Sequence, residues 1–247
     1  MTRRETFEQD GFVAVPNFCG AEQLAGIEDA LRRFMSRRLI ELPSEHVFFE
    51  DTTDPSTLKQ IQRLHNHDEF FGAFMAGAPR RLAEELLGEP VVGKNLQYFN
   101  KPPAIGQATP PHQDGFYFML EPCRALTMWM ALDVVDAENG CVRYVRGSHT
   151  RGMRPHGRTE TLGFSQGITD FGQPVDSENE VACPAQPGDL LVHQALTIHR
   201  ADANASATRN RRALGFIFYA ESARENVAAH EAYQAELATE LAVAGKI

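Results

Sequence analysis

The chain has 247 residues, of which 43% are hydrophobic and 23% charged, ordinary globular proportions that exclude wholesale disorder and fit one large domain. Its 24 basic and 33 acidic residues give a net charge of −9. This balance argues against nonspecific nucleic-acid binding, which depends on clustered lysine and arginine. No apolar run long enough to cross a bilayer occurs, so we expect no membrane-spanning helix.

The four cysteines are widely separated and form no C-x-x-C motif, which excludes a zinc ribbon and a thioredoxin-type motif. The amino-terminal residues are polar and lack the apolar segment of a secretion signal. Both features predict a cytoplasmic protein with reduced thiols. The cysteines are Cys19, Cys123, Cys141 and Cys183.

The first third of the chain, about residues 1–89, is predicted to form a largely helical flank. A short strand is expected at 12–16 and a loop at 41–56. A helix is expected at 79–87, with a proline near its start and a glycine just after its end. A longer amphipathic helix is expected at 21–39, where apolar residues recur at helical spacing. They are Leu24, Ile27, Leu31 and Met35.

Segment 59–74 contains the pair His65 and His67, followed directly by Asp68. Such pairs arise often by chance, and the surrounding sequence is polar and typical of a helix. Residues two positions apart on a helix face different directions. We therefore expect this pair not to hold a metal ion.

From residue 90 the sequence changes to apolar runs separated by turns, which is typical of strands. The turn at 136–140 contains Asn139-Gly140, the dipeptide that most favours a hairpin, so the next strand is expected to return beside the previous one. Residues 150–180 are polar and glycine-rich and are expected to form a functional lid or a flexible loop. The expected strands are 91–99, 110–118, 125–133, 141–145, 190–199 and 211–220.

Helices first, then roughly eight strands, then an alanine-rich helix together predict a mainly β fold with flanking helices. We expect a double-stranded β-helix, that is, a jelly-roll barrel of the cupin type. The chain is expected to be a single domain, 1–247, with its barrel at about 90–220 and its last helix at about 221–244.

The strand that carries His112 and Asp114 would point both side chains to the same face. An imidazole beside a carboxylate supplies two of the three ligands in the 2-His-1-carboxylate triad of non-haem Fe(II) sites. The third ligand must come from farther along the chain. We predict His199, at a strand end before a polar loop. His193 could equally be a core histidine, and His230 lies on a predicted helix.

A basic residue, Arg211 or Arg212, follows His199 at the start of the next strand. Arginine binds carboxylates through two parallel hydrogen bonds, as an acidic cosubstrate would require. Strand alternation places Arg211 in phase with the small residues Ala213 and Gly215, which favours Arg211 as the arginine that faces a pocket.

The strand predicted at 125–133 has two different faces. One face is bulky and suits packing between layers. The other has small residues, including Thr127, around Trp129, and leaves room for a ligand.

The chain contains the segments DGFVAVPNF at 10–18, NKPP at 100–103, PHQD at 111–114, ENGC at 138–141, VRGSH at 145–149, and a run from PGD at 187–189 through His199 to Asn204. Taken together, these segments resemble the phytanoyl-CoA dioxygenase (PhyH) family of Fe(II)- and 2-oxoglutarate-dependent oxygenases. The resemblance extends from near residue 7 to about residue 220, and its motifs are jointly specific.

The resemblance implies that His112, Asp114 and His199 bind Fe(II), and that the carboxylate of 2-oxoglutarate pairs with Arg211. A carboxylate at position 114 favours hydroxylation, because related halogenases carry a small residue there. The implied reaction uses O2, hydroxylates an unactivated C–H bond and releases succinate and CO2.

The same resemblance implies that Gln97 and Trp129 line the cosubstrate site, with Thr127 a further candidate. Departures from the family pattern leave the metal ligands intact and bear on the arginine register. Arg146 stands where proline is usual, Arg200-Ala201 replaces Gly-Ser or Gly-Ala, and the loop up to Arg211 is about one residue longer than is common.

Aromatic residues near the ligands predict a partly apolar substrate pocket. The resemblance implies a small-molecule substrate of natural-product or acyl type. The family acts on several substrate classes, so membership alone does not choose among them. We expect no nucleic-acid or membrane partner, and a monomer or small homo-oligomer. The alternatives are a metal-dependent jelly-roll dioxygenase that does not use 2-oxoglutarate, and a non-catalytic small-molecule-binding barrel. The aromatic residues are Phe99, Phe116, Tyr117 and Phe118.

Overall fold

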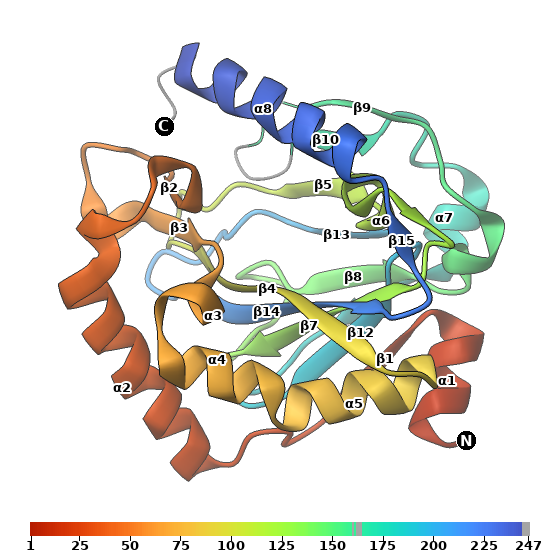
Figure 1. Cartoon of the computed structure of the whole chain (residues 1–247), viewed down its shortest axis with the longest axis horizontal. Coiled ribbons are helices and arrows are strands. Elements are labelled where there is room, and N and C mark those ends of the chain that lie inside the picture. Colours follow the sequence, from red (N-terminus) through yellow and green to blue (C-terminus); the bar gives the residue numbers. More distant parts are fainter. Residues whose placement is uncertain (160, 162–164, 244–247) are drawn as a thin grey trace.

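The computed structural model describes residues 1–159, 161 and 165–243, and it contains two antiparallel β-sheets that face each other (Figure 1). The larger sheet has seven strands. In spatial order they are β1 (Phe12–Val15), β12 (Leu190–Gln194), β7 (Ala125–Ala131), β14 (Arg211–Ala220), β4 (Val91–Lys101), β3 (Leu58–Ile61) and β2 (Val47–Phe49).

The smaller sheet has four strands, and two further strand pairs lie beside the sheets. The four are β11 (Glu180–Cys183), β8 (Val142–Val145), β13 (His199–Ala201) and β5 (Thr109–His112). The pairs are β9 (His156–Arg158) with β10 (Gln166–Ile168), and β6 (Leu120–Glu121) with β15 (Arg224–Glu225).

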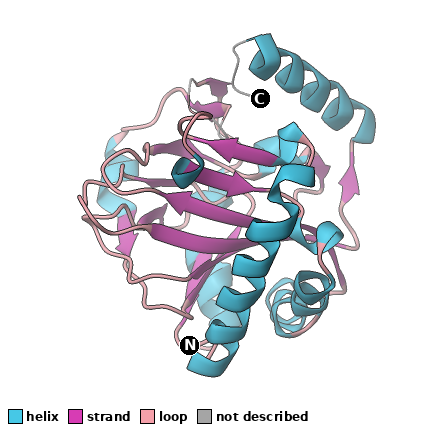
Figure 2. Ribbon diagram, turned by 90° about the vertical axis from the view of Figure 1, so that its left-hand side faces the viewer, coloured by secondary structure: helices cyan, strands magenta, loops and turns pink. Residues whose placement is uncertain are grey.

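Helices cover the outer face of the larger sheet, whereas the last helix lies on the other side of the molecule, above the smaller sheet (Figure 1). Figure 2 shows this last helix beside the carboxy terminus. The covering helices are α1 (Arg3–Asp10), α2 (Ala21–Arg38), α4 (Glu69–Ala76) and α5 (Ala78–Leu87); the others are α3 (Leu64–His67), α6 (Gly115–Phe118), α7 (Pro174–Asn179) and α8 (Val227–Val243).

The main core lies between these helices and the larger sheet. Ile27 and Phe34 of α2 pack in one buried cluster with Leu126 and Met128 of β7. The bulky face predicted for this strand therefore does pack between layers. A second cluster fills the space between the two sheets and contains Phe12, Trp129, Tyr144, Leu191 and Ala213.

Local sequence sets both ends of α1. At its start, the Thr2 hydroxyl accepts a hydrogen bond from the Glu5 backbone N–H, and the Glu5 carboxylate accepts one from the Thr2 backbone N–H. Gly11 ends the helix at φ 85°, and a Cβ there would lie 2.4 Å from Nδ1 of His149. Only glycine fits this turn without displacing its neighbour.

The strand expected around His112 and Asp114 was predicted wrongly beyond His112. β5 ends at His112, and Asp114 has helical backbone angles of φ −58° and ψ −32°. The Asp114 carbonyl accepts the backbone N–H groups of Tyr117 and Phe118, and Gly115 N–H donates to Ala195 O at 2.8 Å. These bonds satisfy the backbone groups without a strand partner, so the aromatic run forms α6 and not a strand.

The single strand expected at 190–199 was also wrong. β12 ends at Gln194, and a turn carries the chain to the smaller sheet, where β13 begins at His199. The turn is fixed because Thr197 donates its backbone N–H to Gln194 O at 2.9 Å and its hydroxyl to Gly11 O at 2.7 Å. His193 and His199 therefore approach from opposite sheets.

The hairpin expected at Asn139-Gly140 does not form, although the turn does. β8 pairs with β11 and β13 in the smaller sheet, while β7 lies in the larger one. The Asn139 side chain accepts the Asp136 N–H and donates to Val134 O, which closes the turn on itself. The turn thus passes the chain from one sheet to the other.

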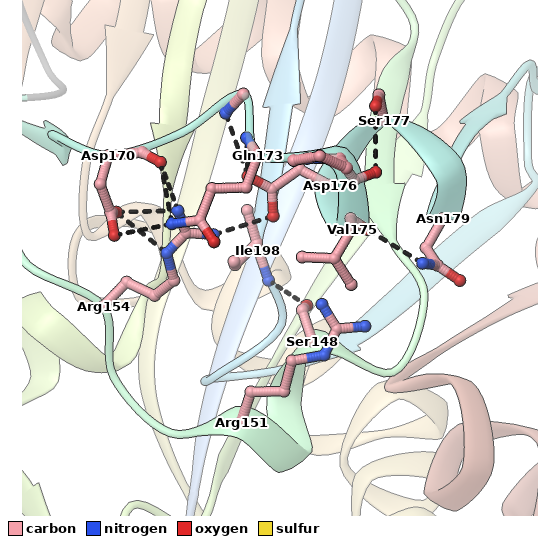
Figure 3. A network of polar contacts seen from close by, with 12 residues as sticks. Ser148, Arg151, Arg154, Asp170, Gln173, Val175, Asp176, Ser177, Asn179 and Ile198 are labelled. Atoms are coloured by element: carbon pink, nitrogen blue, oxygen red, sulfur yellow. Dashed lines mark hydrogen bonds and ion pairs between the residues drawn. The ribbon is translucent and has the colours of Figure 1, made fainter.

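Two segments expected as loops contain regular structure. Residues 41–56 include the short strand β2, which pairs with β3. Within the described part of 150–180, the chain forms β9, β10 and α7. Figure 3 shows a network of polar contacts around α7, which includes Arg154, Asp170 and Asp176. Residues 160 and 162–164 of this segment lie outside the described residues.

Candidate metal centre and its pocket

His112, Asp114 and His199 meet between the two sheets. His112 ends β5 and lies opposite His199 of β13 in the strand register, while Asp114 reaches the same point from the turn before α6. Their potential ligand atoms all lie within 4.8 Å of one another, and no other such group of three occurs among the described residues. The Asp114 Oδ1 atom is 3.4 Å from His112 Nε2 and 3.6 Å from His199 Nε2.

The backbone orients both histidines of this triad. His112 Nδ1 lies 2.8 Å from Pro110 O, and His199 Nδ1 lies 3.0 Å from Thr197 O. A carbonyl oxygen only accepts hydrogen bonds, so Nδ1 carries the proton in each ring and Nε2 carries the lone pair. The two Nε2 atoms and Asp114 Oδ1 therefore lie close together with lone pairs available, as metal ligation requires.

Charge states at the triad also suit a cation. Burial, reinforced by His112 and His193, lowers the pKa of His199 well below its ordinary value, which keeps the imidazole neutral. Burial opposes ionisation of Asp114, but its interactions with the surrounding histidines, His199, His112 and His193, outweigh burial and hold the pKa of this carboxyl well below its ordinary value. Two imidazoles and one carboxylate are the donor set of non-haem Fe(II) sites, so the residues present fit that metal.

The triad opens into a pocket of about 1390 Å³ that also contains Arg211, the first residue of β14. Arg211 is 5% exposed, and its guanidinium lies 5.2 Å from the centre of the Trp129 ring. Its Nε has no hydrogen-bond partner, and no carboxylate among the described residues forms an ion pair with it. Burial lowers the pKa of Arg211 to about 10, which reflects a desolvated charge that lacks a counter-ion.

Arg212 points to the other side of β14 and has its own partners. It pairs with Asp133 at 2.7 Å and with Glu28 of α2 at 2.9 Å. As strand alternation predicted, Arg211 faces the pocket and Arg212 faces away from it.

The three other residues predicted for the cosubstrate site all line this pocket. Gln97 accepts a 2.6 Å hydrogen bond from Gln60, which leaves its own amide N–H groups for other partners. Trp129 lies under Arg211. Thr127 faces the triad, where its hydroxyl donates to Asp114 Oδ2 at 2.5 Å.

Two buried lysines line the pocket and were not singled out from the sequence. Lys101 donates to Asp202 O at 2.7 Å, and Lys59 pairs with Glu50 at 3.1 Å. Burial, together with the charges of Arg211 and Lys59, lowers the pKa of Lys101 well below its ordinary value. An anionic ligand bound beside Arg211 and Lys101 would stabilise the charged forms of these basic groups. The only sequence signal was the place of Lys101 in the NKPP motif.

Three other histidines considered from the sequence, His65, His67 and His230, are not part of the triad. His65 Nδ1 accepts the Leu96 N–H at 3.2 Å, His67 Nε2 lies 3.3 Å from His46 Nδ1, and His230 pairs with Glu225 at 3.1 Å. Of the four aromatic residues expected near the substrate, Phe99, Tyr117 and Phe118 line the pocket. Phe116 instead stacks on His156, with ring centroids 4.5 Å apart.

Comparison with known proteins gives one consistent result. A model of the phytanoyl-CoA dioxygenase (PhyH) family matches residues 7–213. The peroxisomal phytanoyl-CoA dioxygenase of Bos taurus is 23% identical over 221 residues, which is 83% of this chain and 64% of that protein. The chain thus spans less than two thirds of the length of this curated relative.

Solved structures agree with the fold. EvdO2 from Micromonospora carbonacea var. aurantiaca, complexed with 2-oxoglutarate, superposes with a TM-score of 0.70 at 26% identity, covering 90% of this chain and 91% of that one. The non-heme alpha ketoglutarate dependent epimerase SnoN from nogalamycin biosynthesis gives a TM-score of 0.71 at 25% identity, covering 90% and 84%. The predicted jelly-roll architecture with flanking helices is confirmed. No helix in the described ranges is long and apolar enough to cross a membrane.

Proposed function

The chain belongs to the phytanoyl-CoA dioxygenase (PhyH) family, and on that premise we propose that it is an Fe(II)- and 2-oxoglutarate-dependent dioxygenase. Its substrate would be a small molecule that is hydroxylated at an unactivated C–H bond. One observation carries the proposal: a metal-type triad and a buried arginine without an acidic partner, among the described residues, line the same pocket.

The roles follow residue by residue. His112, Asp114 and His199 would hold the iron, because their donor atoms are close and in suitable charge states. When bound, the iron, 2-oxoglutarate and O2 supply the oxidising chemistry, in which 2-oxoglutarate becomes succinate and CO2 while an oxygen atom enters the substrate. The protein's part is to bind, orient and exclude water.

Arg211 would neutralise the carboxylate of 2-oxoglutarate that lies farther from the metal. Its planar guanidinium can form two parallel hydrogen bonds to a carboxylate, and it lines the same pocket as Lys101. Trp129 holds the guanidinium from one side. Gln97 would donate its amide N–H to the same cosubstrate. The 2-oxoglutarate bound in the EvdO2 structure supports this choice of cosubstrate.

Other parts of the pocket lining would receive the substrate. Tyr117, Ile217 and Tyr219 supply apolar surface to the pocket, while Asn95 and Arg158 supply polar groups. A mixed lining of this kind suits a functionalised natural product better than a plain acyl chain, and SnoN acts in nogalamycin biosynthesis. We therefore favour a natural-product-type substrate. The expectations of a cytoplasmic protein, and of a monomer or small homo-oligomer, remain predictions.

The test is turnover of 2-oxoglutarate. Purified protein supplied with Fe(II), O2 and 2-oxoglutarate should release succinate, and a substrate should raise the rate and gain one oxygen atom by mass spectrometry. Asp114→Ala and His112→Ala should abolish both signals. Substrate oxidation without succinate would point to a metal-dependent dioxygenase that does not use 2-oxoglutarate. Binding without oxidation would point to a non-catalytic barrel, and either outcome would overturn the proposal.

A further inference from the structure

His193 lies next to the metal triad but makes contacts of a different kind. It comes from β12 in the larger sheet and is 3% exposed. Its ring centroid is 4.1 Å from that of His199, yet its nitrogen atoms are not among the potential metal ligands of the triad. Its Nε2 lies 3.1 Å from Asp114 Oδ2, and its Nδ1 lies 3.0 Å from the Tyr144 hydroxyl.

These partners fix where the proton of His193 resides. An ionised carboxylate only accepts hydrogen bonds, so the Nε2 that contacts Asp114 carries the proton. The Tyr144 hydroxyl can then donate to Nδ1. This tautomer is the reverse of that in His112 and His199, whose Nδ1 atoms face backbone carbonyls. His193 therefore has no lone pair directed at the metal position.

The two oxygens of Asp114 have different surroundings. Oδ2 accepts hydrogen bonds from the Thr127 hydroxyl at 2.5 Å and from His193 at 3.1 Å. Oδ1 is 3.4 Å and 3.6 Å from the two ligand histidines, beyond the usual length of a hydrogen bond. Protein side chains thus hold one oxygen, and the other is presented between two imidazole lone pairs.

Asp114 needs such support because no strand fixes it. Its backbone lies in the turn between β5 and α6. Tyr144, in contrast, is fully buried on β8, and its ring stacks on Phe12 with centroids 4.6 Å apart. The chain of contacts from Tyr144 through His193 to Asp114 therefore ties a carboxylate on a turn to both sheets of the barrel.

We infer that His193 is a positioning residue: oriented by Tyr144 and acting with Thr127, it holds Oδ2 of Asp114 so that only Oδ1 is offered to the metal. The inference rests on the proposed function, since it assumes that the triad binds a metal. A partner that orients a metal-ligating side chain typically contributes about 10- to 100-fold to metal affinity. His193 should contribute in that range without being a ligand.

The test is Mn(II) binding to the full chain, measured by electron paramagnetic resonance titration. His193→Leu should weaken Mn(II) binding about 10- to 100-fold. His193→Gln, which keeps an N–H donor near the position of Nε2, should recover most of the loss. The matched control is His149→Leu, since His149 is also buried but bonds the backbone oxygen of Glu8. That variant should bind Mn(II) as the wild type does.

Two nearly isosteric variants keep the inference testable if His193→Leu does not fold. Thr127→Val removes one hydrogen bond to Oδ2 and should weaken Mn(II) binding about 10-fold, and Tyr144→Phe should weaken it less, about 3-fold. Wild-type affinity in the folded members of this set would overturn the positioning role while leaving the proposed function standing. A wild-type protein that binds no Mn(II) would overturn the proposed metal centre, and this inference with it.

Discussion

Arg154 is half-buried, with 13% of its side chain exposed, and Arg211 is buried, but their electrostatic surroundings are opposite. Arg154 pairs with Asp176 at 2.8 Å and with Asp170 at 2.8 Å, and it also donates to Asp170 O (Figure 3). Asp176 in turn accepts the backbone N–H groups of Gly172 and Gln173. Arg211 lies beside Trp129 in the pocket and has no acidic partner among the described residues.

The pKa values of the two arginines differ accordingly. Burial alone would lower both. At Arg154 the hydrogen bonds and charges of Asp170 and Asp176 outweigh burial and raise the pKa, whereas at Arg211 burial prevails and lowers the pKa to about 10. A charged side chain that other residues of the fold neutralise, such as Arg154, stabilises the structure. A buried charge that the fold leaves unpaired is costly unless a ligand completes it, and this difference separates structure from function here.

The largest expected effect is on the free energy of unfolding when Arg154, the arginine paired with carboxylates, is replaced. Arg154→Met leaves the Asp176 carboxylate, whose side chain is 1% exposed, without its cation, and should lower the free energy of unfolding by about 3–5 kcal/mol. Urea unfolding monitored by circular dichroism measures this. The control is Asp170→Asn, because Asp170 is 41% exposed and its loss leaves Arg154 paired; the cost should stay below about 1 kcal/mol. Equal effects of the two variants would contradict the account.

Replacing Arg211, the arginine without an acidic partner among the described residues, should have a different effect. Arg211→Met should leave the unfolding free energy unchanged or slightly raised, because it removes an uncompensated buried charge. It should instead cost about 2–5 kcal/mol of 2-oxoglutarate binding, measured by calorimetry on the Mn(II)-loaded protein without O2. Arg211→Lys keeps the charge but loses the planar fork, so it should fall between the two. A strongly destabilised Arg211→Met that still binds 2-oxoglutarate normally would reverse the assigned role.

Gln113 connects the two regions and should respond in both. It lies between His112 and Asp114 and is fully buried. Its side chain donates to Gly152 O and Leu196 O and accepts the Arg154 N–H at 2.8 Å. Gln113→Leu should therefore lower the unfolding free energy by about 1–3 kcal/mol and also weaken Mn(II) binding.

The control for Gln113 is Gln173→Leu, an exposed position in the Arg154 network, which should change neither quantity appreciably. A Gln113→Leu protein that lost stability but bound Mn(II) with wild-type affinity would show that the two regions are independent.

The smallest effect is a dependence of stability on pH in the metal-free protein. The folded-state pKa of His199 lies below its unfolded value of 6.5, so its contribution is present above pH 6.5 and is lost as pH falls below it. The slope should reach about 1.4 kcal/mol per pH unit for this group. His46, His65 and His156, with pKa values lowered mainly by burial, act in the same direction.

Arg154 remains charged throughout this range, so these histidines and not the charge of Arg154 should set the slope. Urea unfolding between about pH 7.5 and 5.5 tests this, and His199→Gln should flatten the curve. Stability that held constant or rose as pH fell would contradict the assignment.

Much of the site could be predicted because its arrangement depends on the spacing of residues along the chain. His112 and Asp114 lie so close along the chain that they meet whether the backbone is a strand or a turn; the strand was wrong, yet the pairing of the two side chains followed. Alternation likewise placed Arg211 toward the pocket and Arg212 toward α2, because β14 is a regular strand.

What could not be predicted depended on contacts between distant segments. The turn after Gln194 is closed by Gly11, far away in sequence, so no local pattern separates β12 from β13. The role of His193 depends on Tyr144 across the barrel, and the fate of the Asn139 turn depends on which sheet receives β8. These are tertiary facts that a turn dipeptide or a six-residue spacing does not encode.

The most direct single measurement is the visible absorption of the Fe(II)-loaded protein when 2-oxoglutarate is added without O2. A charge-transfer band requires the metal and the cosubstrate to be bound together at one site. The account predicts a saturable band in the wild type that is absent in Asp114→Ala and appears only at much higher 2-oxoglutarate in Arg211→Met. A wild-type protein that gave no band at saturating Fe(II) and 2-oxoglutarate would contradict it.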